Sequence, residues 1–197
     1  AKRGHHIHGI FFEDSVPQSC ASLVDSAATG VDLSLPGIYE TEEGRELFGN
    51  VDCVLHLAAR PKPWEKFEVI WKNNLMSDYN VLEMACSANV PRVVLASSTH
   101  IHHGKLMLDG CAEGIRHEEF GKHHGSEDAM IDMHEIDCSS FYGIGKVFSE
   151  SMGKWFARHR SLEFLALRIG WMVPEENPFD SKWIGDEDAR NFMRAVY

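Results

Sequence analysis

The sequence of 197 residues has no apolar run approaching the roughly 20 residues that a membrane-spanning helix needs, and no pattern of a signal peptide. We therefore expect no membrane partner, and the cytoplasm is the default location. Cysteines are few, odd in number and scattered: Cys20, Cys53, Cys86, Cys111 and Cys138. This pattern favours reduced, mostly buried thiols over a disulfide framework.

Basic charge is also scarce, because 19 Lys and Arg residues face 30 Asp and Glu residues, for a formal net charge of −11. Nucleic acids and anionic membranes would be repelled by such a surface, which argues against either as a partner. The composition, 44% hydrophobic and 25% charged, is typical of a globular protein. The length predicts one domain over residues 1–197.

Short apolar runs alternate with longer amphipathic segments along the chain. Residues 51–57, 92–98 and 164–169 read as strands buried on both faces, and residues 67–88 have helical spacing. A second long helix is expected to begin near Ser139 and Ser140. This alternation predicts an α/β fold with a doubly wound parallel sheet flanked by helices.

The second of these helices places Tyr142 and Lys146 on one face, one turn apart. A nearby ammonium favours the phenolate, which would lower the pKa of Tyr142 toward a range useful for proton exchange with a hydroxyl. Ser98 ends the strand at 92–98, where ligands of open α/β sheets bind, and could orient the substrate oxygen. A serine that caps a turn is the structural alternative.

Ser98 with Tyr142-x-x-x-Lys146 resembles the catalytic set of the extended short-chain dehydrogenase/reductases, the NAD-dependent epimerase/dehydratase family. Segments that flank this set also resemble the family, and they occur in its order: 51–59, Asn74 with 80–85, 92–98 and 167–170. The uronate dehydrogenase branch is the most similar, through 168–175 and through Ser98-Thr99-His100.

The resemblance implies an NAD-dependent oxidoreductase or epimerase that acts on a sugar or sugar derivative. Tyr142 would be the general base, while Lys146 would lower its pKa and hold the nicotinamide ribose. Ser98 would hydrogen-bond the developing carbonyl, and Asn74 would support the site. Substrate contacts are expected from Ser98, Thr99, His100 and Tyr142.

Cofactor contacts implied by the resemblance lie mostly just after predicted strands. They are Asp14, Asp32, Leu33, Leu57, Ala58, Ala59, Asn74, Tyr142, Lys146 and Ile169. Asp14 favours NAD because a carboxylate there accepts from a ribose hydroxyl and repels a phosphate, but NADP stays open. For Asp32 a simple loop aspartate is an equal alternative, and Ala58 and Ala59 would also suit a tight turn.

The sequence departs from the family in ways that leave other functions open. The family's first strand and its Gly-x-x-Gly-x-x-Gly turn have no counterpart before the strand expected at 5–12, so we expect a sheet without its central strand. We also expect most of the family's C-terminal substrate region to be missing from this sequence. Because the glycine turn holds the pyrophosphate, a non-catalytic Rossmann-like homologue with a binding or regulatory role is the alternative.

Substrate and assembly are less defined by the sequence. Trp171 replaces a serine that contacts sugar in the uronate dehydrogenase branch, and only Lys182 could replace the arginine that clamps a carboxylate. A uronate is therefore doubtful as the substrate, and a homodimer is left open. The stretch at about 102–138 resembles an insertion rich in histidine, yet its spacing matches no zinc pattern, so no metal is expected.

Overall fold

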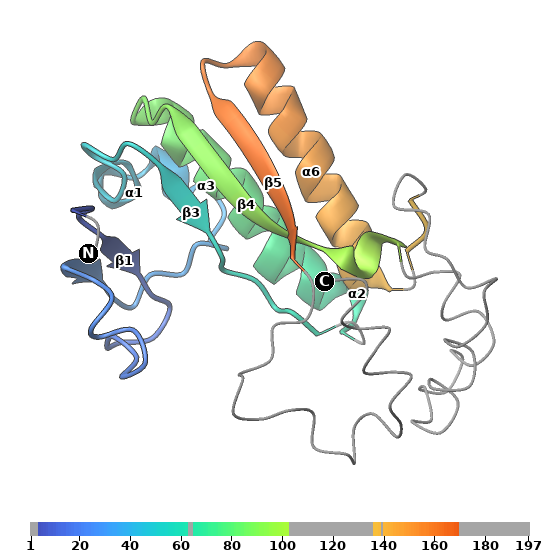
Figure 1. Cartoon of the computed structure of the whole chain (residues 1–197), viewed down its shortest axis with the longest axis horizontal. Helices are drawn as coiled ribbons and strands as arrows, with labels where there is room; N and C mark the ends of the chain where they lie inside the picture. The colour runs from blue at the N-terminus through green and yellow to red at the C-terminus, as the bar shows by residue number, and fades with distance from the viewer. Residues whose placement is uncertain (1–3, 63–64, 103–135, 139, 170–197) are drawn as a thin grey trace.

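The computed structural model describes residues 4–62, 65–102, 136–138 and 140–169, and all the strands among them pair in parallel (Figure 1). The strands are β1 (His8–Ile10), β2 (Ser26–Ala28), β3 (Val54–His56), β4 (Arg92–Ser98) and β5 (Glu163–Ile169). Helical segments connect most of them, as parallel pairing requires. The prediction of a parallel α/β fold is confirmed.

The strands fall into two sheets, a pair β1–β2 and a three-stranded sheet in the order β3–β4–β5. In a doubly wound fold the strand order runs outward in both directions from a central strand. Among the described residues nothing occupies that central place between β1 and β3. The described strands therefore agree with the expected Rossmann-like arrangement of parallel strands, but they form two separate sheets.

The helical segments are η1 (Ile38–Glu40), α1 (Glu42–Glu46), α2 (Phe67–Ile70), η2 (Trp71–Leu75), α3 (Met76–Ser87), η3 (Thr99–His102) and α6 (Phe141–His159). The helix expected at 67–88 is continuous but contains one wide π-turn, η2. Such turns recur at functional sites. Helices α3 and α6 lie along the same face of the β3–β4–β5 sheet (Figure 1).

The hydrophobic core lies between this face of the sheet and the two helices. Val93 of β4 packs there with Leu82 and Met84 of α3 and with Phe156 of α6, all of them buried. Burial of large side chains of this kind contributes about 1.5–3 kcal/mol each. The core therefore fixes α6 against β4, the two elements that carry the predicted catalytic residues.

The opposite face of the three-stranded sheet is uncovered among the described residues. Leu55, Val94 and Leu165 lie side by side in register, and Leu55 and Leu165 are 60% and 51% exposed. The expectation that these strands are buried on both faces is therefore wrong for the described part of the chain. Strand β3 is also shorter than the expected 51–57, because its ladder with β4 covers only three residues.

Helix α6 begins at a polar cap and starts close to its neighbours. The Ser140 hydroxyl accepts a hydrogen bond from the Gly143 amide at 3.2 Å, which satisfies one of the free amides of the first turn. A methyl group on Gly143 would lie 2.6 Å from the carbonyl oxygen of His100 in η3. One on Gly145 would lie 2.8 Å from Ile70 of α2. Glycine thus permits close contact on two sides.

Two other expectations bear on the remaining residues. Cys20, Cys86 and Cys138 are half-buried and Cys53 is exposed, so these free thiols are less buried than predicted because they lie at the margins of the core. Cys111 and most of the predicted insertion lie outside the described residues. In the described part of the chain, no helix combines the length and apolar character that crossing a bilayer demands.

Candidate active site

The residues predicted at the strand tip and at the helix start meet. Ser98 is the last residue of β4 and Tyr142 is the second residue of α6, and the two side chains lie close enough for Ser98 to influence the pKa of Tyr142. The Ser98 hydroxyl also accepts from the His100 amide at 3.2 Å. Ser98 and Tyr142 are only 6% and 8% exposed. Their hydroxyls form a shielded pair at the carboxyl edge of the sheet.

The ionisation of Tyr142 differs from the prediction. Burial is the main cause that raises the pKa of Tyr142, the nearby Ser98 side chain opposes this rise, and the negative charge of Asp78 adds to it. The expectation that Lys146 lowers this pKa is not met in this structure. The reason is geometric, since the Lys146 ammonium lies 5.8 Å from the centre of the tyrosine ring and is directed elsewhere.

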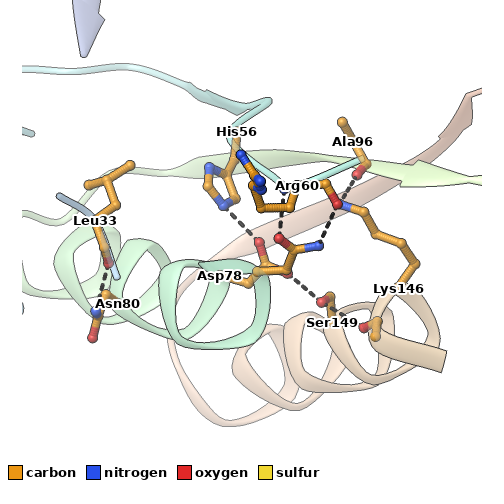
Figure 2. A network of polar contacts seen from close by, with 10 residues as sticks. Leu33, His56, Arg60, Asp78, Asn80, Ala96, Lys146 and Ser149 are labelled. Carbon is orange, nitrogen blue, oxygen red and sulfur yellow. Dashed lines mark hydrogen bonds and ion pairs between the residues drawn. The ribbon is translucent and has the colours of Figure 1, made fainter. Parts of the chain in front are cut away.

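Lys146 lies one helical turn after Tyr142 and is 3% exposed. Its Nζ donates a hydrogen bond of 2.6 Å to the Ala96 carbonyl oxygen in β4 (Figure 2). Burial lowers the pKa of Lys146, while the carboxylates of Asp78 and Glu150 act to raise it. Besides any role toward a ligand, this side chain fastens α6 to the edge of the sheet where Ser98 lies.

Asn74 lies in the π-turn and is 2% exposed. Its Oδ1 accepts from the Arg60 amide at 2.7 Å, and its Nδ2 donates to the Arg60 carbonyl at 3.2 Å (Figure 2). Both ends of the amide thus hold the loop that follows β3, which contains Leu57, Ala58 and Ala59. Asn74 supports the candidate site through this loop.

The other predicted cofactor contacts also lie at carboxyl ends of strands. Asp14 follows β1, Asp32 and Leu33 follow β2, and the exposed Leu57 and Ala58 follow β3. Ile169 ends β5 and pairs with Ser98. The first three belong with the two-stranded sheet, whereas the catalytic candidates belong with the three-stranded one.

The hydrogen bonds of Asp32 favour a simple loop aspartate over a contact with the cofactor. Its Oδ1 accepts from the Ser34 amide at 2.9 Å and from the Ser34 hydroxyl at 2.6 Å, so this oxygen closes its own turn. The turn is held against α3, because Asn80 donates to the Leu33 carbonyl at 2.7 Å (Figure 2). These bonds place the Asp32-Leu33 loop firmly beside α3.

The predicted substrate contacts cluster around the Ser98–Tyr142 pair. Thr99 is buried in η3, and the His100 ring lies 5.7 Å from the Tyr142 ring at an angle of 77°. Burial lowers the pKa of His100, so its imidazole is neutral at neutral pH. A small polar surface of hydroxyls and a neutral imidazole is suited to hydrogen bonding with a polyol.

The sequence did not reveal that a buried carboxylate lies under the site. Asp78 of α3 is 0% exposed; His56 Nε2 lies 2.8 Å from its Oδ1, and Ser149 of α6 donates to its Oδ2 (Figure 2). The pKa of Asp78 is lowered, because hydrogen bonds and the charges of His56 and Lys146 outweigh the effect of burial. The available signal was an acidic residue four positions after Asn74, on the apolar side of a helix.

A second buried carboxylate, that of Glu150, was also not predicted from the sequence. Glu150 accepts from the Ser97 hydroxyl at 2.6 Å and from two nitrogens of Arg168, Nε at 3.0 Å and Nη2 at 2.9 Å. Arg168 Nη1 lies 2.9 Å from His102 Nε2. Burial raises the pKa of Glu150, but the bonds from Arg168 and Ser97 more than offset this and leave the pKa below its usual value.

Several sequence-based expectations lie outside the described residues. These are the histidines of the insertion from His103 to His134, Trp171 and Lys182. Within the described ranges, no group of three His, Cys, Asp or Glu side chains is placed to hold a metal ion.

Comparison with known proteins shows the family of this chain. The sequence model of the NAD dependent epimerase/dehydratase family matches residues 16–185. L-arabinose 1-dehydrogenase (NAD(P)(+)) of Haloferax volcanii is 30% identical over 168 residues, 85% of this chain and 63% of that enzyme. A uronate dehydrogenase of Agrobacterium fabrum is 27% identical over 150 residues, 74% of this chain and 48% of that protein. The chain thus spans less than two thirds of either relative.

A solved structure supports the fold. That of glucuronic acid dehydrogenase from Chromohalobacter salexigens superposes with a TM-score of 0.61 at 22% identity, over 86% of this chain and 53% of that one. At this identity the likeness shows a Rossmann-like fold.

Proposed function

The chain belongs to the NAD-dependent epimerase/dehydratase family, and on that premise we propose that it is an NAD-dependent oxidoreductase or epimerase acting on a sugar or sugar derivative. The observation that carries the proposal is the proximity of the buried Ser98 and Tyr142 side chains at the carboxyl edge of a parallel sheet. A buried phenol beside a second hydroxyl is suited to proton exchange with an alcohol.

In this proposal the two hydroxyl groups act on one substrate oxygen. The phenolate form of Tyr142 accepts the proton of the substrate hydroxyl, and Ser98 donates a hydrogen bond to the oxygen as it becomes a carbonyl. A bound NAD would supply the hydride acceptor for the substrate carbon that carries this oxygen. Lys146 provides a positive charge next to the phenol and a donor for the ribose, and Asn74 keeps the loop after β3 in place.

NAD is the proposed cofactor, and the residues present fit it in part. The exposed Ala58 and the neighbouring Ala59 allow a dinucleotide to approach the backbone after β3, and Asp14 offers an acceptor to a ribose hydroxyl. The relatives' names include both NAD-dependent and NAD(P)-dependent enzymes. NADP therefore belongs in any binding experiment.

Relatives also suggest which sugars to try first. They are named for L-arabinose, for glucose-6-phosphate and for uronates. The neutral surface formed by Ser98, Thr99 and His100 provides hydrogen bonds but no fixed positive charge for a carboxylate or phosphate. Uncharged aldoses such as L-arabinose are therefore the proposed substrate class, with uronates as the comparison.

The rival proposal is a non-catalytic homologue with a binding or regulatory role. A buried lysine and a buried phenol are costly to desolvate, which favours a catalytic role for them over a purely structural one. Titration of the protein with NAD and with NADP, followed by fluorescence, separates the two. Saturable binding that weakens in a Lys146→Met variant supports the enzyme, and no binding at millimolar cofactor supports the scaffold.

We further propose a homodimer formed through an exposed apolar surface, here called the α6 seam. Phe141, Ile144, Phe148 and Trp155 recur at coiled-coil spacing along α6 and are 47–50% exposed. Phe67 extends the seam onto α2, where its ring lies 5.6 Å from that of Phe141. Large contiguous apolar surfaces of this kind mark interaction sites.

A second copy is the occupant that the size of the seam favours. With Trp71, six large side chains each expose roughly 100 Å², so two copies would bury on the order of 1,200 Å². That is the lower end of the range for stable interfaces. Because most of the seam is one stripe along α6, two copies can pair this surface about a two-fold axis.

The remaining proposals concern location and domain organisation. Free thiols such as the exposed Cys53 are suited to a reducing compartment, and the cytoplasm is the proposed location. Residues 1–197 are proposed to act as one cofactor-binding domain.

A further inference from the structure

Buried charge is unevenly distributed around α6. One ammonium, Lys146, and two carboxylates, Asp78 and Glu150, are almost fully shielded from solvent. Each such charge needs a counter-charge or several hydrogen bonds, because an unpaired buried ion costs several kcal/mol. Which carboxylate compensates Lys146 is therefore a specific structural question.

Glu150 is already neutralised by another cation. Arg168 of β5 binds it through two nitrogens, Nε and Nη2, and Ser97 of β4 occupies the same carboxylate. The forked pairing is the strong geometry for arginine with a carboxylate. Arg168 therefore compensates most of the negative charge of Glu150, without a contribution from Lys146.

Asp78 has no permanent cation among its hydrogen-bond partners. His56 of β3 and Ser149 of α6 hold its two oxygens (Figure 2). Ser149 lies three positions after Lys146 on the same helix, so Asp78 is fixed against the stretch of α6 that carries Lys146.

We propose that Asp78 is a positioning residue that, held by His56 and Ser149, supplies the buried negative charge that keeps Lys146 protonated. This inference rests on the proposed function only in assigning Lys146 a part in the reaction. It goes further by placing a fully buried residue of a different helix in control of the charge in the site.

The electrostatics agree with this assignment. Burial lowers the pKa of Lys146, and Asp78 is the largest influence that raises it, ahead of Glu150. In return, the charge of Lys146 helps to lower the pKa of Asp78. The other titratable groups next to Lys146 are Glu150 and Tyr142 of its own helix α6. His56 of β3 is bonded to Asp78, and Arg168 of β5 is bonded to Glu150.

A purely structural tie between α3 and α6 is the competing explanation, and Ser149 distinguishes the two. Ser149→Ala removes a hydrogen bond to Asp78 but leaves the charge. Asp78→Asn removes the charge but leaves a side chain of the same shape. A structural role predicts similar effects of both variants on Lys146, whereas the charge role predicts an effect of Asp78→Asn alone.

The experiment follows the protonation of Lys146 directly. Lysine labelled with ¹³C and ¹⁵N at the ε position is incorporated into the protein, and the Lys146 signal is identified by its loss in Lys146→Arg. A pH titration by NMR is expected to show the ammonium form at neutral pH and a midpoint that moves to lower pH in Asp78→Asn. Ser149→Ala should titrate like the unsubstituted protein. Equal midpoints in the two variants would overturn the proposal.

Two further measurements keep the test decisive. If Asp78→Asn does not fold, the unsubstituted protein suffices, because a neutral Lys146 at neutral pH overturns the proposal and an ammonium with an ionised Asp78 supports it. NAD titration of the same samples separates this inference from the proposed function. A shifted midpoint without NAD binding would support the role of Asp78 and refute the cofactor. NAD binding with an unshifted midpoint would support the cofactor and refute the role of Asp78.

Discussion

Ser98 and Tyr142 lie beside each other where the carboxyl end of β4 meets the first turn of α6. Their proximity depends on the packing of α6, which is capped by Ser140, approaches η3 at Gly143 and is fastened to β4 by Lys146. Changes that move the start of α6 should therefore affect the site even when they leave its hydroxyl groups in place.

Gly143→Ala tests this dependence. The added methyl group would lie 2.6 Å from the backbone carbonyl oxygen of His100, so α6 or η3 must move. We expect a loss of about 1–3 kcal/mol in the free energy of unfolding, measured by urea denaturation, together with lower activity. Gly49→Ala is the matched control, because its methyl group would meet no atom closer than 3.4 Å. Equal stability of the two variants would contradict the close packing described for α6.

The Glu150–Arg168 pair should contribute to stability in a pH-dependent way. Glu150→Gln removes one partner of a pair whose carboxylate is 6% exposed, and should cost about 2–3 kcal/mol at neutral pH. Because the folded-state pKa of Glu150 is lowered, this contribution is complete above the usual value of 4.5 and is lost as the pH falls below it.

Glu163→Gln is the control for this effect. It breaks a pair with Arg92 in which both side chains are more than half exposed, so a much smaller loss than that of Glu150→Gln is expected. Denaturation curves of both variants at several pH values provide the comparison. The prediction fails if Glu150→Gln costs no more than Glu163→Gln, or if its cost does not change in acid.

The α6 seam should determine the oligomeric state. Phe148→Glu places a charge in the middle of the seam, and we expect the dimer dissociation constant to rise by about 30-fold or more. Leu23→Glu changes an equally exposed leucine of the β1–β2 connection and should leave the dimer intact. Analytical ultracentrifugation measures both. A monomeric unsubstituted protein at all concentrations would refute the dimer.

Activity should rise with pH. Burial raises the pKa of Tyr142, so the phenol is protonated at neutral pH and the base form increases as the solution becomes alkaline. Sugar oxidation should therefore be faster above neutral pH, whereas the reverse reduction, which needs the protonated phenol, should change little around neutral pH and slow as the solution becomes alkaline. Initial rates across the pH range test this, and an oxidation rate that falls steadily from neutral to alkaline pH would contradict it.

Local sequence patterns were sufficient for the elements that build the site. The apolar run at 92–98 predicted β4, and serine before a helical pattern predicted the start of α6. Because a strand tip and a helix start at the same sheet edge are brought together by the fold itself, the contact of Ser98 with Tyr142 followed from topology.

The burial of the strand faces and the partners of the buried charges could not be predicted from local sequence patterns. An apolar strand such as β5 indicates that both faces can be covered, but the cover comes from elements far away in the sequence. Likewise, nothing local to Asp78 shows that His56 and Ser149 will meet it, or that Lys146 will be directed to Ala96. These pairings depend on how three separate segments pack.

The most direct test of the central claim is sugar-dependent formation of NADH by the protein and by its Tyr142→Phe variant, with L-arabinose and glucuronate as first substrates. Tyr142→Phe removes only the phenol oxygen from the Ser98–Tyr142 pair. The account predicts measurable turnover by the unsubstituted protein, a loss of about 10²-fold or more in kcat for the variant, and unchanged NAD binding. Turnover that survives in Tyr142→Phe would contradict it.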